Sequence, residues 1–138
     1  MNTRPDKSKI LILGVTAVGK GTLAFELAKH LNADGAPNLD GRQDVSVHKW
    51  ASVGFDLPGR QATVVLFGHP SNARGDAAYF TMNKPFAYLS ATQLLDKEPL
   101  VYRAGDRWQL NYLVTVYPAL KTRAAIQARG QRWEASQP

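Results

Sequence analysis

The stretch that most constrains the fold runs from Lys9 to Thr22, where a short apolar segment leads into a glycine-rich loop that ends in lysine. Ile10 to Leu13 are apolar and of the kind that forms a strand buried on both faces. Gly14 and Gly19-Lys20 follow at the spacing of a P-loop, in which backbone N–H groups turn toward one anion and the lysine adds a positive charge. The sequence therefore predicts a strand, a phosphate-binding loop and the start of a helix.

The helix predicted after this loop covers about Lys20 to Leu31, because apolar residues recur there at helical spacing. Its N-terminus would direct free N–H groups and the positive end of the helix dipole at a bound phosphate. Thr22 is the candidate Mg²⁺ ligand, since Gly21 occupies the position that usually carries a serine or threonine hydroxyl. The predicted phosphate-binding residues are Gly14, Thr16, Ala17, Gly19, Lys20, Gly21 and Thr22.

Residues 32–41 are rich in turn formers, at the point where a doubly wound nucleotide-binding domain would place its second strand. From Asp44 onward the apolar pattern has the period of two that is typical of strands. A turn at Leu57–Arg60 and a final helix at Leu120–Arg129, with Gly130 just past its end, complete the expected elements. The predicted strands are Val45–Val47, Ala62–Phe67, Tyr79–Met82, Phe86–Leu89 and Trp108–Tyr117, the last forming a hairpin with Leu100–Tyr102 through the turn Ala104–Asp106.

The fold class predicted is α+β, with one N-terminal β-P-loop-α unit, an antiparallel sandwich-like region and a short C-terminal helix. With 138 residues, of which 44% are hydrophobic, one ordinary core is expected. The predicted organisation is a disordered leader at 1–9, the P-loop unit at 10–32, a turn-rich linker at 33–43, the antiparallel region at 44–118 and a basic helical tail at 119–138.

The net charge of +6 favours an anionic partner, either a phosphorylated small molecule or nucleic acid. Part of the excess positive charge is local, because Glu134 is the only acidic residue among the basic residues of the C-terminal tail. This tail could contact tRNA, and the alternative is that it is simply a solvated helix face. No segment is long and apolar enough to span a bilayer, and the leader lacks a signal peptide's apolar core, so a cytoplasmic location is expected. The absence of cysteine excludes disulfides and thiolate chemistry. The basic residues of the tail are Lys121, Arg123, Arg129 and Arg132.

The segments Leu13–Lys20 and Leu23–Ala28 are similar to the N-terminus of tRNA dimethylallyltransferases (IPP transferases), over about 35 residues. This resemblance implies that the loop holds ATP or the pyrophosphate of dimethylallyl diphosphate. The segment Leu39–Gln43 resembles the family's next element, which makes Asp40 a candidate base toward a tRNA adenine; a turn-forming role is the alternative. The chain is too short for the family's helical tRNA-binding region, so phosphate binding without full prenyl transfer is expected. The ending Gly19–Thr22 also resembles the loop of adenylate kinases.

The segments Val64–Arg74, Met82–Phe86 and Ala104–Asp106 are similar to the PmoA-like β-sandwich proteins, which carry a methane-oxygenase label. The likeness spans about residues 44–118. It implies the alternative of a non-catalytic β-sandwich module of unknown ligand with an appended glycine loop. His69 and Asn72 are candidates to line a polar pocket; the alternative is a His-Pro turn in which Asn72 bonds its own backbone.

Two further patterns are open to more than one interpretation. Asp56-Leu57-Pro58-Gly59 matches the Asp-x-x-Gly of GTPases, although the segment before it is a poor Walker B strand. The three tryptophans, Trp50, Trp108 and Trp133, are expected to be core and edge residues of the sheet, with a base-stacking surface as the alternative.

Overall fold

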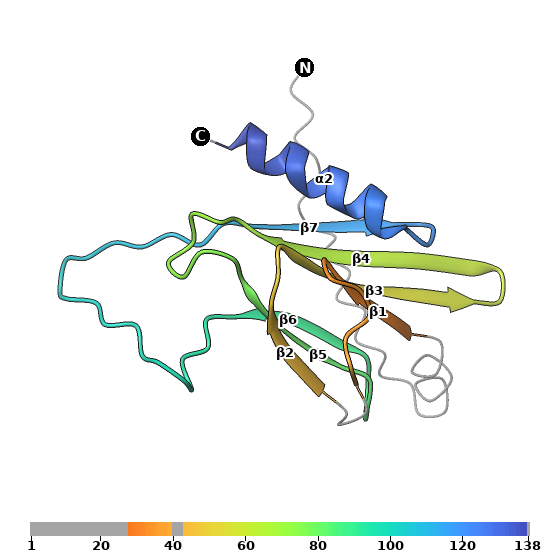
Figure 1. The fold of residues 1–138 in the computed structure, drawn as a ribbon, viewed down its shortest axis with the longest axis horizontal. Coiled ribbons are helices and arrows are strands. Elements are labelled where there is room, and N and C mark those ends of the chain that lie inside the picture. The colour runs from red at the N-terminus through yellow and green to blue at the C-terminus, as the bar shows by residue number, and fades with distance from the viewer. Residues whose placement is uncertain (1–27, 40–42, 138) are drawn as a thin grey trace, which may run out of the picture.

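A computed structural model describes residues 28–39 and 43–137. Two antiparallel sheets and one helix make up this part of the chain (Figure 1). Sheet A has the strand order β1-β3-β4-β7 and sheet B the order β2-β5-β6. The strands are β1 (Ala28–Asn32), β2 (Gln43–Val47), β3 (Trp50–Leu57), β4 (Arg60–Gly68), β5 (Ala78–Met82), β6 (Tyr88–Thr92) and β7 (Tyr112–Tyr117), and the helix is α2 (Arg123–Ser136).

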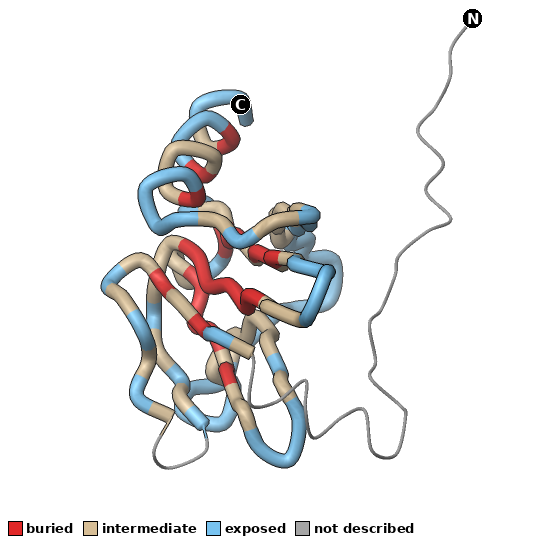
Figure 2. Tube along the Cα trace, turned by 90° about the vertical axis from the view of Figure 1, so that its right-hand side faces the viewer, coloured by how far each residue is buried: buried red, intermediate tan, exposed pale blue. Residues whose placement is uncertain are grey.

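The helix α2 lies along one face of sheet A, and sheet B packs on the opposite face (Figure 1). One buried cluster fills the space between helix and sheet, with Trp50, Val65 and Phe67 meeting Ile126 and Trp133. The second cluster lies between the sheets and contains Ala51, Ala77 and Tyr79. The buried positions of α2 recur on the side that faces the strands (Figure 2). Sheet A is therefore the central layer of three.

The antiparallel prediction for the second half of the chain is confirmed. The predicted strands at 45–47, 62–67 and 79–82 lie within β2, β4 and β5. The turn at Leu57–Arg60 joins β3 to β4, and Gly59 adopts there a φ of 71° that favours glycine. The sixth strand begins later than predicted, at Tyr88, so that only residues 88 and 89 of the expected segment belong to it.

The helix predicted for residues 20–31 is wrong at its C-terminal end. Residues 28–32 form β1, which pairs with Ala51–Phe55 of β3. Pairing with a neighbouring strand buries His30 and Asn32 on one side of the segment and leaves Leu31 to pack on the helix cluster. A tertiary partner thus overrides the helical spacing of the leucines, because strand formation depends mainly on what the side chains pack against.

Three further predictions are corrected. The predicted strand at 108–111 and its hairpin with Leu100–Tyr102 do not form. The pairing of β4 with β7 ends at Gly68 and Tyr112, followed by a single hydrogen bond from the N–H of His69 to the carbonyl of Asn111. Residues 93–111 instead project from the sandwich as an irregular connection (Figure 1), and Trp108 is 59% exposed rather than a core residue. Gly130 lies inside α2 rather than past its end, and Thr122 caps the N-terminus by accepting a hydrogen bond from the N–H of Ala125.

Candidate functional site

The predicted phosphate-binding residues cannot be placed in this fold. Asp40, the candidate catalytic base, lies outside the described residues, as does the whole glycine-rich loop. That loop comprises Gly14, Thr16, Ala17, Gly19, Lys20, Gly21 and Thr22. Within residues 28–39 and 43–137, no group of three or more histidine or acidic side chains is arranged to hold a metal ion. The helix in this part of the chain is not long and apolar enough to cross a membrane.

The segment His69–Asp76, which follows β4, is a tightly bonded loop. The N–H of Asn72 donates to the carbonyl of His69 at 3.0 Å, and the N–H of Gly75 donates to the carbonyl of Asn72 at 2.8 Å. Gly75 has a φ of 72°, which lets the chain reverse there. The His69 ring meets Trp133 edge to face, with 5.4 Å between the ring centroids. The loop is thus held both by its own hydrogen bonds and by the helix.

Asn72 fixes this loop to a distant part of the chain. Its Oδ1 accepts a hydrogen bond from the N–H of Asn111 at 2.7 Å, and its Nδ2 donates to the carbonyl of Asn111 at 3.0 Å. The residue is 5% exposed. This side chain therefore satisfies the backbone of residue 111 just before β7 begins, as a neighbouring strand would. The predicted turn is present, but Asn72 bonds the backbone of Asn111 rather than its own.

The loop carries Arg74 and Asp76 to the wall of a cavity of about 200 Å³ on the outer side of sheet B. The remaining wall comes from the ends of β2 and β6 and from the start of β5. Its lining residues are Val47, Arg74, Asp76, Ala77, Ala78, Thr92, Gln93 and Leu94. His69 and Asn72 do not line this cavity, so their part in it is to hold the loop in place.

Two side chains of the cavity wall have buried polar atoms without any partner, Arg74 through Nε and Gln93 through Oε1. A third buried atom of the wall, Asp76 Oδ1, has no hydrogen-bond partner of regular geometry but lies 2.9 Å from the ammonium of Lys49. The rest of each side chain is engaged. Arg74 Nη2 donates to the carbonyl of Glu98, and Gln93 Nε2 donates to the hydroxyl of Tyr112 at 2.9 Å. A buried donor and a buried acceptor that are both unpaired are unusual in a folded protein, because such atoms normally have a protein group or an ordered water as a partner.

The charges at the cavity are compensated by neighbours. The Lys49 ammonium lies 2.9 Å from Asp76 Oδ1, and the hydrogen bond with this carboxylate raises the pKa of Lys49. Arg74 Nη1 lies 3.7 Å from the carboxylate of Glu98. Leu94 has a φ of 51°, rare for a side chain of its kind, and is held by the hydrogen bond from its N–H to Thr92 Oγ1. Strained backbone of this type is often found at binding sites.

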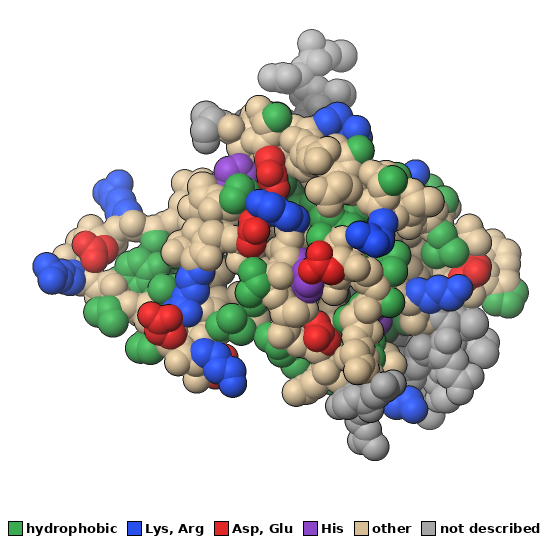
Figure 3. Space-filling model, in the orientation of Figure 1, with side chains coloured by type: hydrophobic (Ala, Val, Ile, Leu, Met, Phe, Trp, Pro, Cys, Tyr) green, Lys and Arg blue, Asp and Glu red, His purple; other side chains and the backbone are tan. Residues whose placement is uncertain are grey.

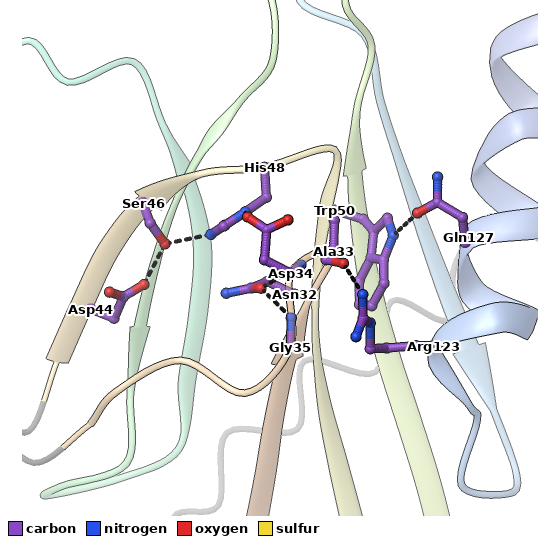
Figure 4. A network of polar contacts seen from close by, with 10 residues as sticks. All are labelled: Asn32, Ala33, Asp34, Gly35, Asp44, Ser46, His48, Trp50, Arg123 and Gln127. Atoms are coloured by element: carbon purple, nitrogen blue, oxygen red, sulfur yellow. Dashed lines mark hydrogen bonds and ion pairs between the residues drawn. The ribbon is translucent and has the colours of Figure 1, made fainter.

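A second polar arrangement lies at the open edge between β1 and β2 (Figure 4). Asp34 Oδ2 is 3.1 Å from His48 Nδ1, His48 Nε2 is 2.8 Å from Ser46 Oγ, and Ser46 Oγ is 2.5 Å from Asp44 Oδ2. The first three residues have the order of a carboxylate, a base and a nucleophile. The same view shows Trp50 Nε1 donating to Gln127 Oε1 at 2.8 Å, a contact that ties β3 to α2.

The number of protons available to these hydrogen bonds shows whether they form a structural link or activate the serine. Three contacts need three protons, and a neutral imidazole together with the serine hydroxyl supplies two. The serine hydroxyl has one proton and donates it to Asp44 Oδ2, so this proton is not directed at His48. The arrangement therefore ties the β1–β2 connection to β2, and the Asp44 carboxylate competes with any activation of Ser46.

The hairpin turn between β3 and β4 borders a larger and shallower hollow of about 620 Å³, lined by residues 56–61 and Pro118. Asp56 Oδ1 accepts a hydrogen bond from Gln61 Nε2 at 2.9 Å across the turn. The sequence Asp56–Gly59 that matches a GTPase motif is thus a β-hairpin turn. Nothing buried and unpaired lies among its lining residues, which makes the cavity at the loop 69–76 the stronger candidate.

The fold class is that of a two-layered antiparallel sandwich covered on one side by a helix. Comparisons with protein-family models, with curated proteins and with solved structures found no match to this chain.

Sequence reasoning missed Arg74, Asp76 and Gln93 as site residues. Arg74 belongs to the HPSNAR segment that the sequence singled out, but a polar pocket was assigned to His69 and Asn72 instead. Gln93 stands in a connection with no motif, and only the fold brings it beside Arg74. The available signal was a loop dense in turn formers directly after a buried strand, with an arginine and an aspartate at its end.

Proposed function

We propose that this chain is a β-sandwich binding module, and that the cavity at the loop 69–76 takes a small neutral molecule rich in hydroxyl groups, of the size of one sugar ring. The observation that supports this best is the pair of unpaired polar atoms, Arg74 Nε as donor and Gln93 Oε1 as acceptor. A hydroxyl group both accepts and donates, so two neighbouring hydroxyls satisfy both atoms. Arg74 and Asp76 already have oppositely charged neighbours, which favours a neutral ligand.

The shape of the cavity supports the same ligand class. Val47, Ala77 and Ala78 give it an apolar wall, against which the C–H groups of a sugar ring can pack. Its volume of about 200 Å³ is below the range of about 300–1,000 Å³ that is usual for drug-sized ligands. Leaving a buried polar group unpaired costs about 1–3 kcal/mol, so a ligand that pairs both atoms gains affinity from each.

Calorimetric titration of the full chain with glucose, xylose and myo-inositol tests the proposal. Arg74→Lys keeps the charge but removes Nε, and should weaken binding by about tenfold, which corresponds to about 1.4 kcal/mol. Arg107→Lys, in the projecting connection, is the matched control and should bind like the original protein. A thermal melt of each variant establishes that the fold is kept.

A second variant acts on the space rather than on the polar atoms. Ala78→Leu introduces a larger side chain at the apolar wall of the cavity and should abolish binding. Absence of binding by the original chain, or equal binding by Arg74→Lys and Ala78→Leu, refutes the assignment of the cavity.

The spacing of Gly14, Gly19 and Lys20 supports a second proposal, that residues 14–22 bind ATP or the pyrophosphate of dimethylallyl diphosphate. In this proposal the N-terminal segment is a P-loop unit and the chain a cytoplasmic, shortened relative of the tRNA dimethylallyltransferases that binds without full transferase activity. Thr22 would hold Mg²⁺, Asp40 would be the base, and the basic residues of α2 would approach tRNA.

Titration with ATP, GTP and dimethylallyl diphosphate, with and without Mg²⁺, tests the phosphate proposal. Lys20→Ala should lose most of the affinity, because it removes the positive charge that offsets the phosphates. Lys84→Ala is a control that removes an equal charge far along the sequence. If no ligand binds, or if Lys20→Ala binds as well as the original chain, the phosphate-binding interpretation of this loop is wrong.

A further inference from the structure

The outer face of sheet B continues from the cavity as a surface without charged side chains. The strand register sorts its residues into three rows that cross the sheet. The row at the cavity is Val47, Ala78 and Thr92; the next is Val45, Phe80 and Ser90; the last is Gln43, Met82 and Tyr88. Val45, Val47 and Tyr88 are 46%, 55% and 40% exposed, whereas Ala78 in the cavity row is 4% exposed. The face is thus continuous with the site, uncharged, and exposed mainly along β2 and at Tyr88.

This face has a polar side and an apolar side. The three residues contributed by β6, Thr92, Ser90 and Tyr88, all carry a hydroxyl group. Those contributed by β5 are apolar throughout, and so are two of the three from β2. A line of hydroxyl groups therefore runs beside an apolar floor, from the cavity toward the far end of the sheet.

Aromatic rings gather at that far end. Tyr88 meets Phe80 with 5.6 Å between ring centroids and Phe86 with 6.0 Å, and both contacts are edge to face. Phe86 is 47% exposed. The three rings thus form one aromatic cluster, held together by contacts of the edge-to-face kind that aromatic pairs favour.

We propose that the outer face of sheet B binds an oligosaccharide, with one sugar ring in the cavity and the following rings on Phe80, Tyr88 and Phe86. The inference rests on the proposed function of the cavity and extends it. Sugar rings combine apolar C–H faces with hydroxyl groups at their rims, and this surface pairs an apolar floor with a line of hydroxyls.

The length of the face sets the size of the ligand. The cavity row and the Tyr88 row lie four residues apart along each strand, and a strand rises about 3.3 Å per residue, so the rows are separated by about 13 Å. One sugar ring is shorter than this distance. A short oligosaccharide is therefore the smallest ligand that reaches both the unpaired atoms of the cavity and the aromatic cluster.

The test compares glucose and xylose with cellotetraose, maltotetraose and xylotetraose in calorimetric titrations of the full chain. At least one tetramer should bind about tenfold or more tightly than its monomer. Phe86→Ala and Tyr88→Ala should remove this advantage and leave monomer binding unchanged. Trp108→Ala, which removes an exposed aromatic ring outside this face, is the matched control and should change neither affinity.

The outcomes separate the two proposals. Equal affinity for monomer and tetramer, or a tetramer advantage that survives Phe86→Ala and Tyr88→Ala, overturns the inference about the sheet face and leaves the cavity assignment standing. Tetramer binding that needs the aromatic residues but not Arg74 supports the face and refutes the cavity. If no tetramer binds and Phe86→Ala converts a dimer to a monomer in sedimentation velocity, the face contacts a second copy and the inference is wrong. Tyr88→Phe keeps the ring, so it should retain part of the tetramer advantage.

Discussion

Gly130 lies on the face of α2 that packs against Phe67 of sheet A, and replacing it with alanine tests this packing directly. A Cβ atom at this position would lie 2.9 Å from Cε1 and 3.0 Å from Cδ1 of Phe67. Phe67 is 1% exposed and packs against Trp133, with 6.4 Å between their ring centroids. Carbon atoms do not approach this closely, so the ring, the helix or the surrounding core must shift.

Two opposing contributions decide the size of the effect. Alanine in a helix interior is favoured over glycine by about 1 kcal/mol. Overpacking a filled core costs about 1–3 kcal/mol. We expect Gly130→Ala to lower the free energy of unfolding by about 1 kcal/mol and the melting temperature by about 3 °C.

Urea unfolding followed by tryptophan fluorescence measures the change, with Gln131→Gly at the neighbouring exposed helix position as a control for helix propensity. That control should cost about 1 kcal/mol. In a Phe67→Leu background, Gly130→Ala should become stabilising, because the ring that it meets is gone. If Gly130→Ala is already as stable as the original chain, the close contact between helix and sheet does not constrain residue 130 and the reasoning fails.

Three other perturbations have clear expected results. Burial lowers the pKa of His30, whose Nε2 lies 3.2 Å from the carbonyl of Tyr88. As the pH falls, the unfolded chain therefore protonates this imidazole before the folded chain does. The contribution of His30 to stability is complete above about pH 6.5 and declines below it. His30→Gln keeps a donor, so urea melts from neutral pH to about pH 5 should fall less steeply for this variant, and equal slopes would contradict the assignment. Asn72→Ala leaves the Asn111 N–H unpaired, although the Asn111 carbonyl still accepts a hydrogen bond from the N–H of His69. The variant should cost about 1–3 kcal/mol in chemical unfolding, whereas a loss below about 0.5 kcal/mol would show that water replaces the side chain. Thr122→Ala removes the N-cap of α2 and should cost about 1 kcal/mol in thermal unfolding. Thr122→Ser keeps the hydroxyl and should retain most of the stability. An unchanged melting temperature for Thr122→Ala would count against the cap.

The sequence predicts the strands that carry a clear apolar pattern, but it does not predict strands whose formation depends on their neighbours in the sheet. Residues 62–67 are an unbroken apolar run, and the turn at Pro58-Gly59 is strongly marked, so β4 and the start of its hairpin are predictable. Strand β3 mixes small, polar and apolar residues with Gly54 and Asp56, and only its place between β1 and β4 explains it. The sequence predicts a final helix but not its end, because a glycine is typical of the residue after a helix, whereas Gly130 lies inside α2 and packs closely on Phe67.

The candidate site is less predictable than the fold. Arg74 and Gln93 are far apart in the sequence, and no motif connects them; β5 and β6 bring them to one wall. The turn at 104–106 was predicted, and the N–H of Asp106 does donate to the carbonyl of Arg103 at 3.0 Å, yet no strand pairing follows from it. A local turn can be inferred from local residues, whereas a cavity depends on the whole arrangement of the sheets.

The projecting connection 93–111 is fastened to the loop 69–76 near both of its ends, by Arg74 to the carbonyl of Glu98 and by Asn72 to the backbone of Asn111. Figure 3 shows hydrophobic side chains grouped on this projection at the left of the molecule. Val101 and Trp108, which belong to this connection, are 85% and 59% exposed. Since both fastenings lie near the sandwich, the stretch between them can be shortened, lengthened or exchanged for another sequence without shifting the cavity wall, at a modest entropic cost that grows slowly with loop length. The sandwich thus offers a permissive position for inserting a tag, a reporter or a second binding segment.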